Sequence, residues 1–555
     1  MLVSAQARRR RTSMIVLNAY GRFRLIDDNG DDVTPVSMKA RGLIALLALS
    51  KDHCRPREWL QDKLWSDRPA KQGAQSMRQV LAIIRRTLGS QAHVLKTDCK
   101  TVSLDPRHFI VAFERRTELQ DNEADQGLFG DLAVPDLEFE DWVREQREAL
   151  ADKSRTRGGE SGSVWGAKAN PAIFFRIGGT GDDDGEQIVR RMMSLATASL
   201  LDFSDFQIFQ EAATPLAHKR VAPQYGIEVE VNCATRVGST QLITTIRDAT
   251  SSRVLWTRTF EIDNTAAPEN VDEDQIHPVS AELVEAILTV FRTRGDDLGI
   301  PECAAMLANR GRNLIFRYDK RSLTEADKLL WLAYWYDPKP QYLAWRSFLR
   351  NMANFQHRSH SFLGDTVDFE TLAREAIHQA PSSAIALGVG AHIEYLCGGS
   401  QRSSQLLARR AIGFDPLNAI NHAILSNAEL VMGNLADSRR LSLKALELAG
   451  GGDYRSFMEF FCCMSAAALG DYHAAIDHAE AALILRPTFR APLRYLVALY
   501  KYTGRTDHLQ RAVLRMRCAE PDFEVSHFLD DTYPVTTLRR MRLIDAIAAG
   551  SNNDS

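Results

Sequence analysis

The side chains best suited to chemistry in this sequence are glutamines and basic residues gathered between positions 70 and 100. Gln and Arg can each make two hydrogen bonds to a base edge, and Lys and Arg can neutralise phosphates. The set consists of Lys71, Gln72, Gln75, Arg78, Gln79, Arg85, Arg86, Lys96 and Lys100. Residues of these types, this close together, predict a surface that contacts nucleic acid.

A helix over residues 70–89 is the element that must position most of this set. Its apolar residues recur at steps of four, three and four, which places them on one helical face: Met77, Leu81, Ile84 and Leu88. The stretches VLKT and TVSL, on either side of residues 98–100, predict a two-stranded hairpin that carries the two later lysines. The simpler alternative is a solvated amphipathic helix with no ligand.

The charge distribution favours a polyanionic partner over that alternative. Residues 1–110 contain 20 Lys and Arg against 10 Asp and Glu, a net charge of +10. The whole chain has a net charge of −3, so the remainder carries −13. A positive module on an acidic body is the pattern expected when one end of a protein meets DNA or RNA.

The stretch from residue 42 to residue 89 resembles the winged-helix domain of OmpR/PhoB-type regulators, and within it the Streptomyces antibiotic regulatory protein type. The similarity includes an apolar helix over about residues 39–50, a short helix ending in Leu64 and Trp65, and a turn at 67–69. A long helix ending in Ile84, Arg85 and Arg86 completes it, and the preceding segment MIVLNAYGRFRLIDDNGDDV matches the small N-terminal sheet that such domains carry.

This resemblance implies a place on DNA for both elements. The helix of residues 70–88 would lie in the major groove, and the hairpin near residues 96–100 would touch the backbone or the minor groove. Ile83 departs from the family, which tends to have a polar or basic residue there, and it is expected to reduce or redirect base contact at the end of the helix.

A second organising pattern is a repeat of about 35 residues in the C-terminal half. Glycines recur at 364, 399, 433, 470 and 504, each followed twelve residues later by a small or apolar residue and seventeen later by Pro or Gly. Glycine permits a sharp turn between two helices, a small residue permits their close approach, and proline ends the second helix. The copy LGDYHAAIDHAEAALILRP closely resembles a tetratricopeptide repeat, so a helical solenoid is expected.

The middle of the chain carries weaker patterns. Residues 127–150 resemble the start of the helical activation domain of the Streptomyces-type regulators, and a Gly- and Ser-rich stretch after them reads as a linker. An α/β pattern follows, and its part from Tyr225 to Asp263 resembles the domain related to the N-terminal part of TolB. The order of the three parts is similar to that of enterobacterial invasion-gene activators.

No catalytic residue, cofactor or metal site is predicted. The loop at 178–184, GGTGDDD, lacks the Lys-Ser/Thr pair of a phosphate-binding loop, and its aspartates would repel phosphate. It is expected to be a solvated turn. The eight cysteines form no CxxC pair, which argues against zinc and against a disulfide framework.

The sequence therefore predicts a multi-domain α+β protein that is not an enzyme. Its parts are a basic arm or mis-assigned start (1–13), a winged-helix domain (14–106), a helical remnant (107–150), a linker (151–170), a TolB-like α/β domain (171–295), tetratricopeptide repeats (302–530), and a C-terminal helix and tail (531–555). No apolar run is long enough to span a bilayer, so a cytoplasmic location without membrane contact is expected.

The function expected from these parts is that of a bacterial transcriptional activator that binds double-stranded DNA. The repeats would receive a protein or peptide signal, and RNA polymerase and a second copy of the chain are further candidate partners. Two alternatives stay open: a scaffold whose winged helix contacts protein instead of DNA, favoured only by Ile83, and a metabolite sensor acting through residues 171–295.

Overall fold

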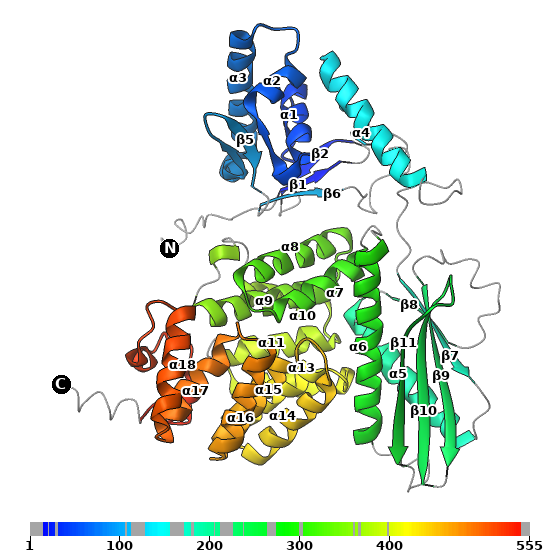
Figure 1. The fold of residues 1–555 in the computed structure, drawn as a ribbon, viewed down its shortest axis with the longest axis vertical. Coiled ribbons are helices and arrows are strands. Elements are labelled where there is room, and N and C mark those ends of the chain that lie inside the picture. Colours follow the sequence, from blue (N-terminus) through cyan, green and yellow to red (C-terminus); the bar gives the residue numbers. More distant parts are fainter. Residues whose placement is uncertain are drawn as a thin grey trace, which may run out of the picture. The chain divides into compact units, whose positions relative to one another are not determined.

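A computed structural model of the chain describes residues 15–19, 22–27, 31–105, 108–112, 128–155, 171–178, 183–204, 206–210, 226–236, 238–263, 273–298, 303–358, 361–363, 368–396 and 399–545. These residues fall into two compact units, one ending at Arg155 and one beginning at Pro171 (Figure 1). The predicted basic arm, most of the predicted linker and the tail after residue 545 lie outside the described residues.

The first unit combines two small sheets with four helices. The first sheet has the order β2-β1-β6, with β1 Ile15–Asn18, β2 Arg24–Ile26 and β6 Phe109–Ala112. The second has the order β3-β5-β4, with β3 Cys54–Pro56, β4 Leu95–Thr97 and β5 Thr101–Leu104. The helices are α1 Met38–Ala48, α2 Arg57–Leu64, α3 Ala70–Leu88 and α4 Leu137–Arg155.

The core of this unit continues past residue 106, where the sequence placed a domain boundary. Strand β6 pairs in parallel with β1, so the first sheet is completed only by residues after that point. Phe129, Val134 and Phe139 are buried in the same apolar cluster as helices α1 to α3. Helix α4 also runs to Arg155, into the stretch predicted as linker from residue 151.

The second unit begins with a five-stranded sheet of order β11-β10-β9-β7-β8. Its elements are β7 Ala172–Gly178, α5 Asp183–Phe203, β8 Gln207–Gln210, β9 Gly226–Arg236, β10 Ser239–Asp248, β11 Val254–Asp263 and α6 Glu273–Leu298. Alternate residues of the central strands, such as Phe175 and Val229, join the core beneath α5 and α6. Helix α6 lies between the sheet and the helices that follow (Figure 1).

Paired helices form the remainder of the second unit. Six successive pairs run through α7 Ala304–Ile315, α8 Lys320–Tyr336, α9 Pro340–His357, α10 Phe369–Gln379, α11 Ala384–Leu396, α12 Gln401–Phe414, α13 Ala419–Val431, α14 Leu435–Ala449, α15 Arg455–Ala468, α16 Tyr472–Leu485, α17 Arg490–Tyr502 and α18 Thr506–Ala519. A short helix, α19 Thr536–Arg540, follows them. The mixed α+β class and the all-helical C-terminal part are thus confirmed.

The repeating residues occupy equivalent positions in these pairs. The small or apolar residues of the repeat all have 0% exposure: Ala376, Ala411, Ala445, Ala482 and Met516. Gly433 and Gly470, in the turns inside two pairs, have φ of 85° and 81°, a conformation that favours glycine. Gly364 lies outside the described residues.

Within the described ranges, no helix combines the length and the apolar composition needed to cross a membrane.

Candidate nucleic-acid interface

Helix α3 buries one face in the first unit and exposes the other. Its buried residues are Gly73, Met77, Val80, Leu81, Ile84 and Leu88, which include all four of the predicted apolar stripe. At 3.6 residues per turn these positions share one side of the helix. The helix bounds also match the prediction, because Pro69 precedes its first turn and Gly89, with φ of 53°, ends it.

The side opposite that stripe carries Gln75, Gln79, Ala82 and Arg86, and all four are exposed. Their spacing of four, three and four places them along one line of the helix. Ala82 was not predicted as a site residue, since a small apolar side chain carries no charge or hydrogen-bonding group. At the centre of this line, its small size lets the helix backbone approach a partner closely.

All nine predicted contact residues are exposed, and seven of them lie on α3: Lys71, Gln72, Gln75, Arg78, Gln79, Arg85 and Arg86. Lys96 lies on β4, and Lys100 lies in the turn between β4 and β5. The hairpin formed by these two strands is confirmed, with Leu95 opposite Leu104 and Thr97 opposite Val102. The structure therefore gathers the predicted residues on a helix and a hairpin of the same unit.

Arg85 joins these two elements. Its Nη2 donates to Thr97 Oγ1 at 2.5 Å, so the last turns of α3 are tied to strand β4. Thr97 carried no predicted role. The contact fixes the direction of the Arg85 guanidinium. Arg85 therefore helps to position β4 against α3, in addition to the nucleic-acid contact predicted for it.

The tip of the hairpin is held by Asp98. Its carboxylate accepts hydrogen bonds from the Thr101 hydroxyl at 2.7 Å and from the backbone N–H groups of Thr101 and Lys100 at 2.6 and 2.7 Å. These bonds, the Thr101 hydroxyl first, lower the pKa of Asp98. Arg57 at the start of α2 adds a bond from Nε to the Asp98 carbonyl oxygen at 2.8 Å. The backbone around Lys100 is thus pre-ordered, and Arg57 is a basic residue beside it that the sequence did not single out.

Lys96 differs from the other predicted residues because it already has a counter-ion. Its Nζ lies 2.8 Å from Oδ2 of Asp105, a carboxylate whose side chain is only 4% exposed. The pair holds β4 against the residue that follows β5. A phosphate contact from Lys96 would have to share the lysine charge with Asp105, and no sequence pattern predicts this pairing.

The turn between α2 and α3 is fixed from a distant part of the chain. Asp136, 8% exposed, accepts from the backbone N–H of Ser66 at 3.1 Å and from its hydroxyl at 2.9 Å. The same carboxylate lies 3.4 Å from Nζ of Lys39, which also donates to the carbonyl oxygen of Leu64 at the end of α2. The segment before α4 therefore sets the geometry of the turn that leads into α3.

Replacing Asp136 by Ala is expected to lower the free energy of unfolding of the first unit by about 2 kcal/mol, because the bonds from Ser66 and Lys39 to a buried carboxylate are lost. Urea denaturation would measure the loss. Asp141→Ala serves as the matched control, since its pair with Arg144 is exposed and should contribute about 0.5 kcal/mol or less. Equal losses of unfolding free energy for Asp136→Ala and Asp141→Ala would contradict the role assigned to Asp136 in fixing this turn.

Ile83, where the sequence departs from the pattern of the resembled family, lies at the edge of the exposed face. It is partly buried and packs against the core of the first unit. On the helix it lies to one side of the line formed by Gln79, Ala82 and Arg86. The expectation that Ile83 reduces or redirects base contact remains a prediction, and the structure adds that its side chain contributes to packing.

Comparison with known proteins adds no further identification: no family model matches the chain, and no curated protein matches it. The families named from sequence patterns thus remain predictions. Most of the loop at 178–184 lies outside the described residues, so its predicted role as a solvated turn also remains a prediction. Function has to be argued from the residues of α3 and of the β4–β5 hairpin.

Proposed function

We propose that this protein is a sequence-specific DNA-binding transcriptional regulator, an activator, whose first unit is a winged helix. Helix α3 would enter the major groove as the recognition helix, and the β4–β5 hairpin would be the wing. The observation that carries the proposal is the exposed line of Gln75, Gln79, Ala82 and Arg86, backed by a fully buried apolar stripe.

The chemistry of that line suits the major groove. Arg reads guanine and Gln reads adenine through paired hydrogen bonds, and an Ala methyl can contact the methyl group of thymine. Lys71 and Arg78, exposed beside the line, are placed to reach phosphates or further bases. Phosphate contacts supply most of the affinity and base contacts supply the preference for sequence.

The second unit would supply the regulation. Its helical pairs, proposed to be tetratricopeptide repeats, would receive a protein or peptide partner, and its α/β part would be the TolB-like domain. RNA polymerase and a second copy of the chain are proposed as further partners, and the cytoplasm as the location. The rival scaffold function rests on Ile83 alone, a partly buried residue that packs against the core of the first unit.

The two predicted lysines of the hairpin should respond differently to substitution. Lys100→Ala is expected to weaken binding to all DNA sequences alike and to reduce the slope of log affinity against log salt by about 1, as for the loss of one phosphate contact. Lys96→Ala should change the slope less, because its charge is paired with Asp105. Fluorescence anisotropy at four or more salt concentrations measures both slopes. A larger change for Lys96→Ala would show that the ion pair opens on DNA.

A further inference from the structure

A cavity of about 50 Å³ lies within the second unit, where α5 and α6 meet the helical pairs. Its walls come both from α5 and α6 and from the helical pairs. Asp202 and Phe203 belong to α5 and Glu285 to α6, while Trp345 belongs to α9 and Asp415 follows α12. At roughly 10–15 Å³ for each water-sized space, the cavity has room for about three to five non-hydrogen atoms.

One positive charge lines the cavity, and it is already paired. The guanidinium of Arg312 makes two parallel bonds of 3.0 Å to the Glu285 carboxylate, which also accepts from the Tyr454 hydroxyl at 3.1 Å. Arg312 further lies over the rings of Phe203 and Tyr454. The charges of Arg312 and Glu285 therefore balance each other, and the Arg312 guanidinium covers the rings of Phe203 and Tyr454.

Two more carboxylates line the cavity, and both accept hydrogen bonds from neutral groups. Asp202 accepts from the backbone N–H groups of Ala384 and Ile385, each at 3.1 Å. Asp415, 3% exposed, accepts from the Leu417 N–H and the Ser199 hydroxyl, again at 3.1 Å. Burial raises the pKa of both groups, and the charge of Asp202 contributes to raising that of Asp415 to about 7. When these two carboxylates are ionised, the described residues that line the cavity leave no positive side chain to balance them, because Arg312 is already paired with Glu285.

An independent feature of the cavity is the indole of Trp345. This residue is 3% exposed and lines the cavity, and its Nε1 finds no hydrogen-bond acceptor among the described residues. A buried N–H without an acceptor destabilises the folded state, because its hydrogen bond to water is lost and not replaced. The cavity is the space beside Trp345 in which an acceptor could lie.

We propose that this cavity binds a short primary amine that also carries a hydroxyl or carbonyl oxygen. Its ammonium group would lie between Asp202 and Asp415, and its oxygen would accept from the indole N–H of Trp345. Apolar side chains of α6, among them Val284 and Leu288, would contact its carbon atoms. A metal ion fits less well, since the described residues include no group of three or more His, Cys, Asp or Glu side chains arranged to hold one.

Binding at this position would couple the two parts of the second unit. A ligand that touches α5, α9 and the turn after α12 stabilises the arrangement in which these elements are adjacent. A fragment of residues 171–295 alone would lack Trp345 and Asp415, so the metabolite sensor foreseen for that segment needs the helical pairs as well. The full chain is accordingly the protein to test, and the test uses no DNA, which separates its outcome from that of the proposed DNA binding.

The test is thermal unfolding of the full chain at pH 8 with ethanolammonium chloride, against sodium chloride at the same ionic strength. The second unit's melting temperature should rise by about 2 °C or more at saturating amine. Ethylammonium, which lacks the oxygen, should give a smaller rise. Propanol, which lacks the charge, and tetramethylammonium, which lacks N–H donors, should give none.

Substitutions make the test specific to this cavity. Asp202→Asn and Asp415→Asn should abolish the rise, and Trp345→Phe should reduce the response to ethanolammonium to that of ethylammonium. Asp507→Asn, at an exposed position on α18, is the matched control and should respond like the unmodified chain. Equal rises in all variants, no rise with any amine, or a rise with Mg²⁺ or Ca²⁺ alone would overturn the proposal.

The pH dependence of folding stability gives a second measurement, in which no variant has to bind the ligand. Because the pKa of Asp415 is raised from near 4 to about 7, its ionisation disfavours the folded state, so stability should fall as pH rises across that window. The charged or titratable groups that face it are Asp202, Glu285, Arg312 and Tyr454. Asp415→Asn should flatten this part of the profile, and the amine should stabilise the unmodified chain more at pH 8 than at pH 6. Greater stabilisation at pH 6 would contradict an ammonium bound by ionised carboxylates.

Discussion

Replacing Asp327 by Ala is expected to lower the free energy of unfolding of the second unit by about 3–5 kcal/mol. Asp327 on α8 is the shared partner of two buried guanidinium groups on α9: Arg346 at 3.1 Å and Arg350 at 2.7 Å. Burial alone would raise the pKa of Asp327, but the charges of the two arginines outweigh it and lower the pKa. Without the carboxylate, two positive charges would remain in the core with no counter-ion.

Chemical denaturation followed by circular dichroism at 222 nm measures this loss, since helices dominate the second unit. Asp437→Ala is the matched control, because the Asp437–Arg440 pair also joins an aspartate to an arginine but is more than half exposed on both sides. Its loss should be about 0.5 kcal/mol or less. A small effect of Asp327→Ala would mean that water or another anion reaches the arginines.

Arg78→Ala and Gln79→Ala are each expected to weaken binding to a preferred DNA site by about 1–3 kcal/mol, which is roughly 5- to 150-fold, and to relax the preference at one base pair. Both side chains are exposed on α3, and neither contributes to the buried stripe. Their loss should therefore leave the melting temperature of the first unit unchanged. Anisotropy titrations with the preferred duplex and with single-base variants of it measure both effects.

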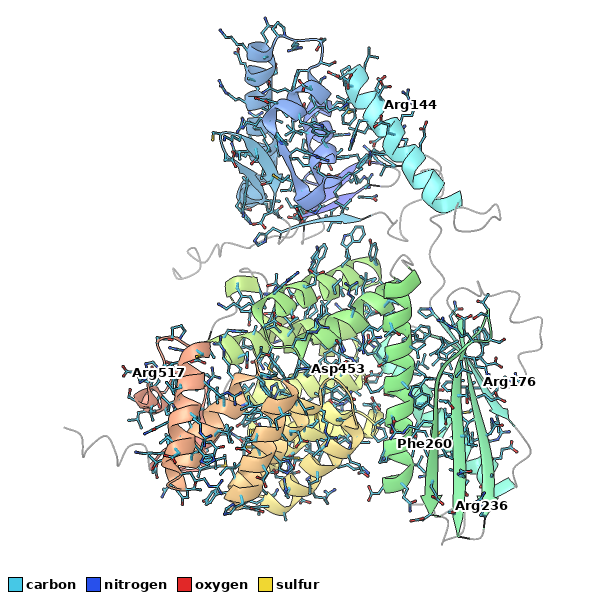
Figure 2. All side chains as sticks on the ribbon, viewed as in Figure 1. Arg144, Arg176, Arg236, Phe260, Asp453 and Arg517 are labelled. Atoms are coloured by element: carbon cyan, nitrogen blue, oxygen red, sulfur yellow. The ribbon has the colours of Figure 1, made fainter. Side chains whose placement is uncertain are left out.

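Arg144→Ala is the matched control for these variants. Arg144 lies on α4 of the same unit (Figure 2), its side chain is 66% exposed, and its pair with Asp141 lies on the helix surface. Its substitution removes the same charge as Arg78→Ala but far from α3 in the sequence. If Arg144→Ala weakened binding as much as Arg78→Ala while Gln79→Ala had no effect, net charge and not recognition by α3 would account for affinity.

The elements that the sequence predicted best are those with a local, repeating cause. The bounds of α3 follow from an apolar residue every third or fourth position between Pro69 and Gly89. The helical pairs follow from small residues, such as Ala411 and Ala482, that recur at a fixed distance from a glycine and are fully buried. In both cases the pattern that predicts the element lies within one short segment.

The features that were missed depend on contacts between distant segments. Asp136 reaches Ser66 across 70 residues, and Ser199 reaches Asp415 across 216. No periodicity marks such pairs, because each partner is a single polar residue whose burial is decided by the rest of the fold. Lys96 was also expected to be available for phosphate, and its pair with Asp105 was missed at short range, because the burial of Asp105 is decided by the rest of the fold.

The most direct test of the proposed function is selection of binding sites by the full chain from a pool of random DNA duplexes, at about 50 and 200 mM salt. We predict enrichment of a defined motif, with affinity for it falling by at least about 10³-fold between the two conditions if six or more phosphates are contacted. Enrichment should be lost in a chain carrying both Arg78→Ala and Gln79→Ala. Binding with no enriched motif, or binding insensitive to salt and to competitor DNA, would contradict a sequence-specific regulator and assign the exposed face of α3 to a protein partner.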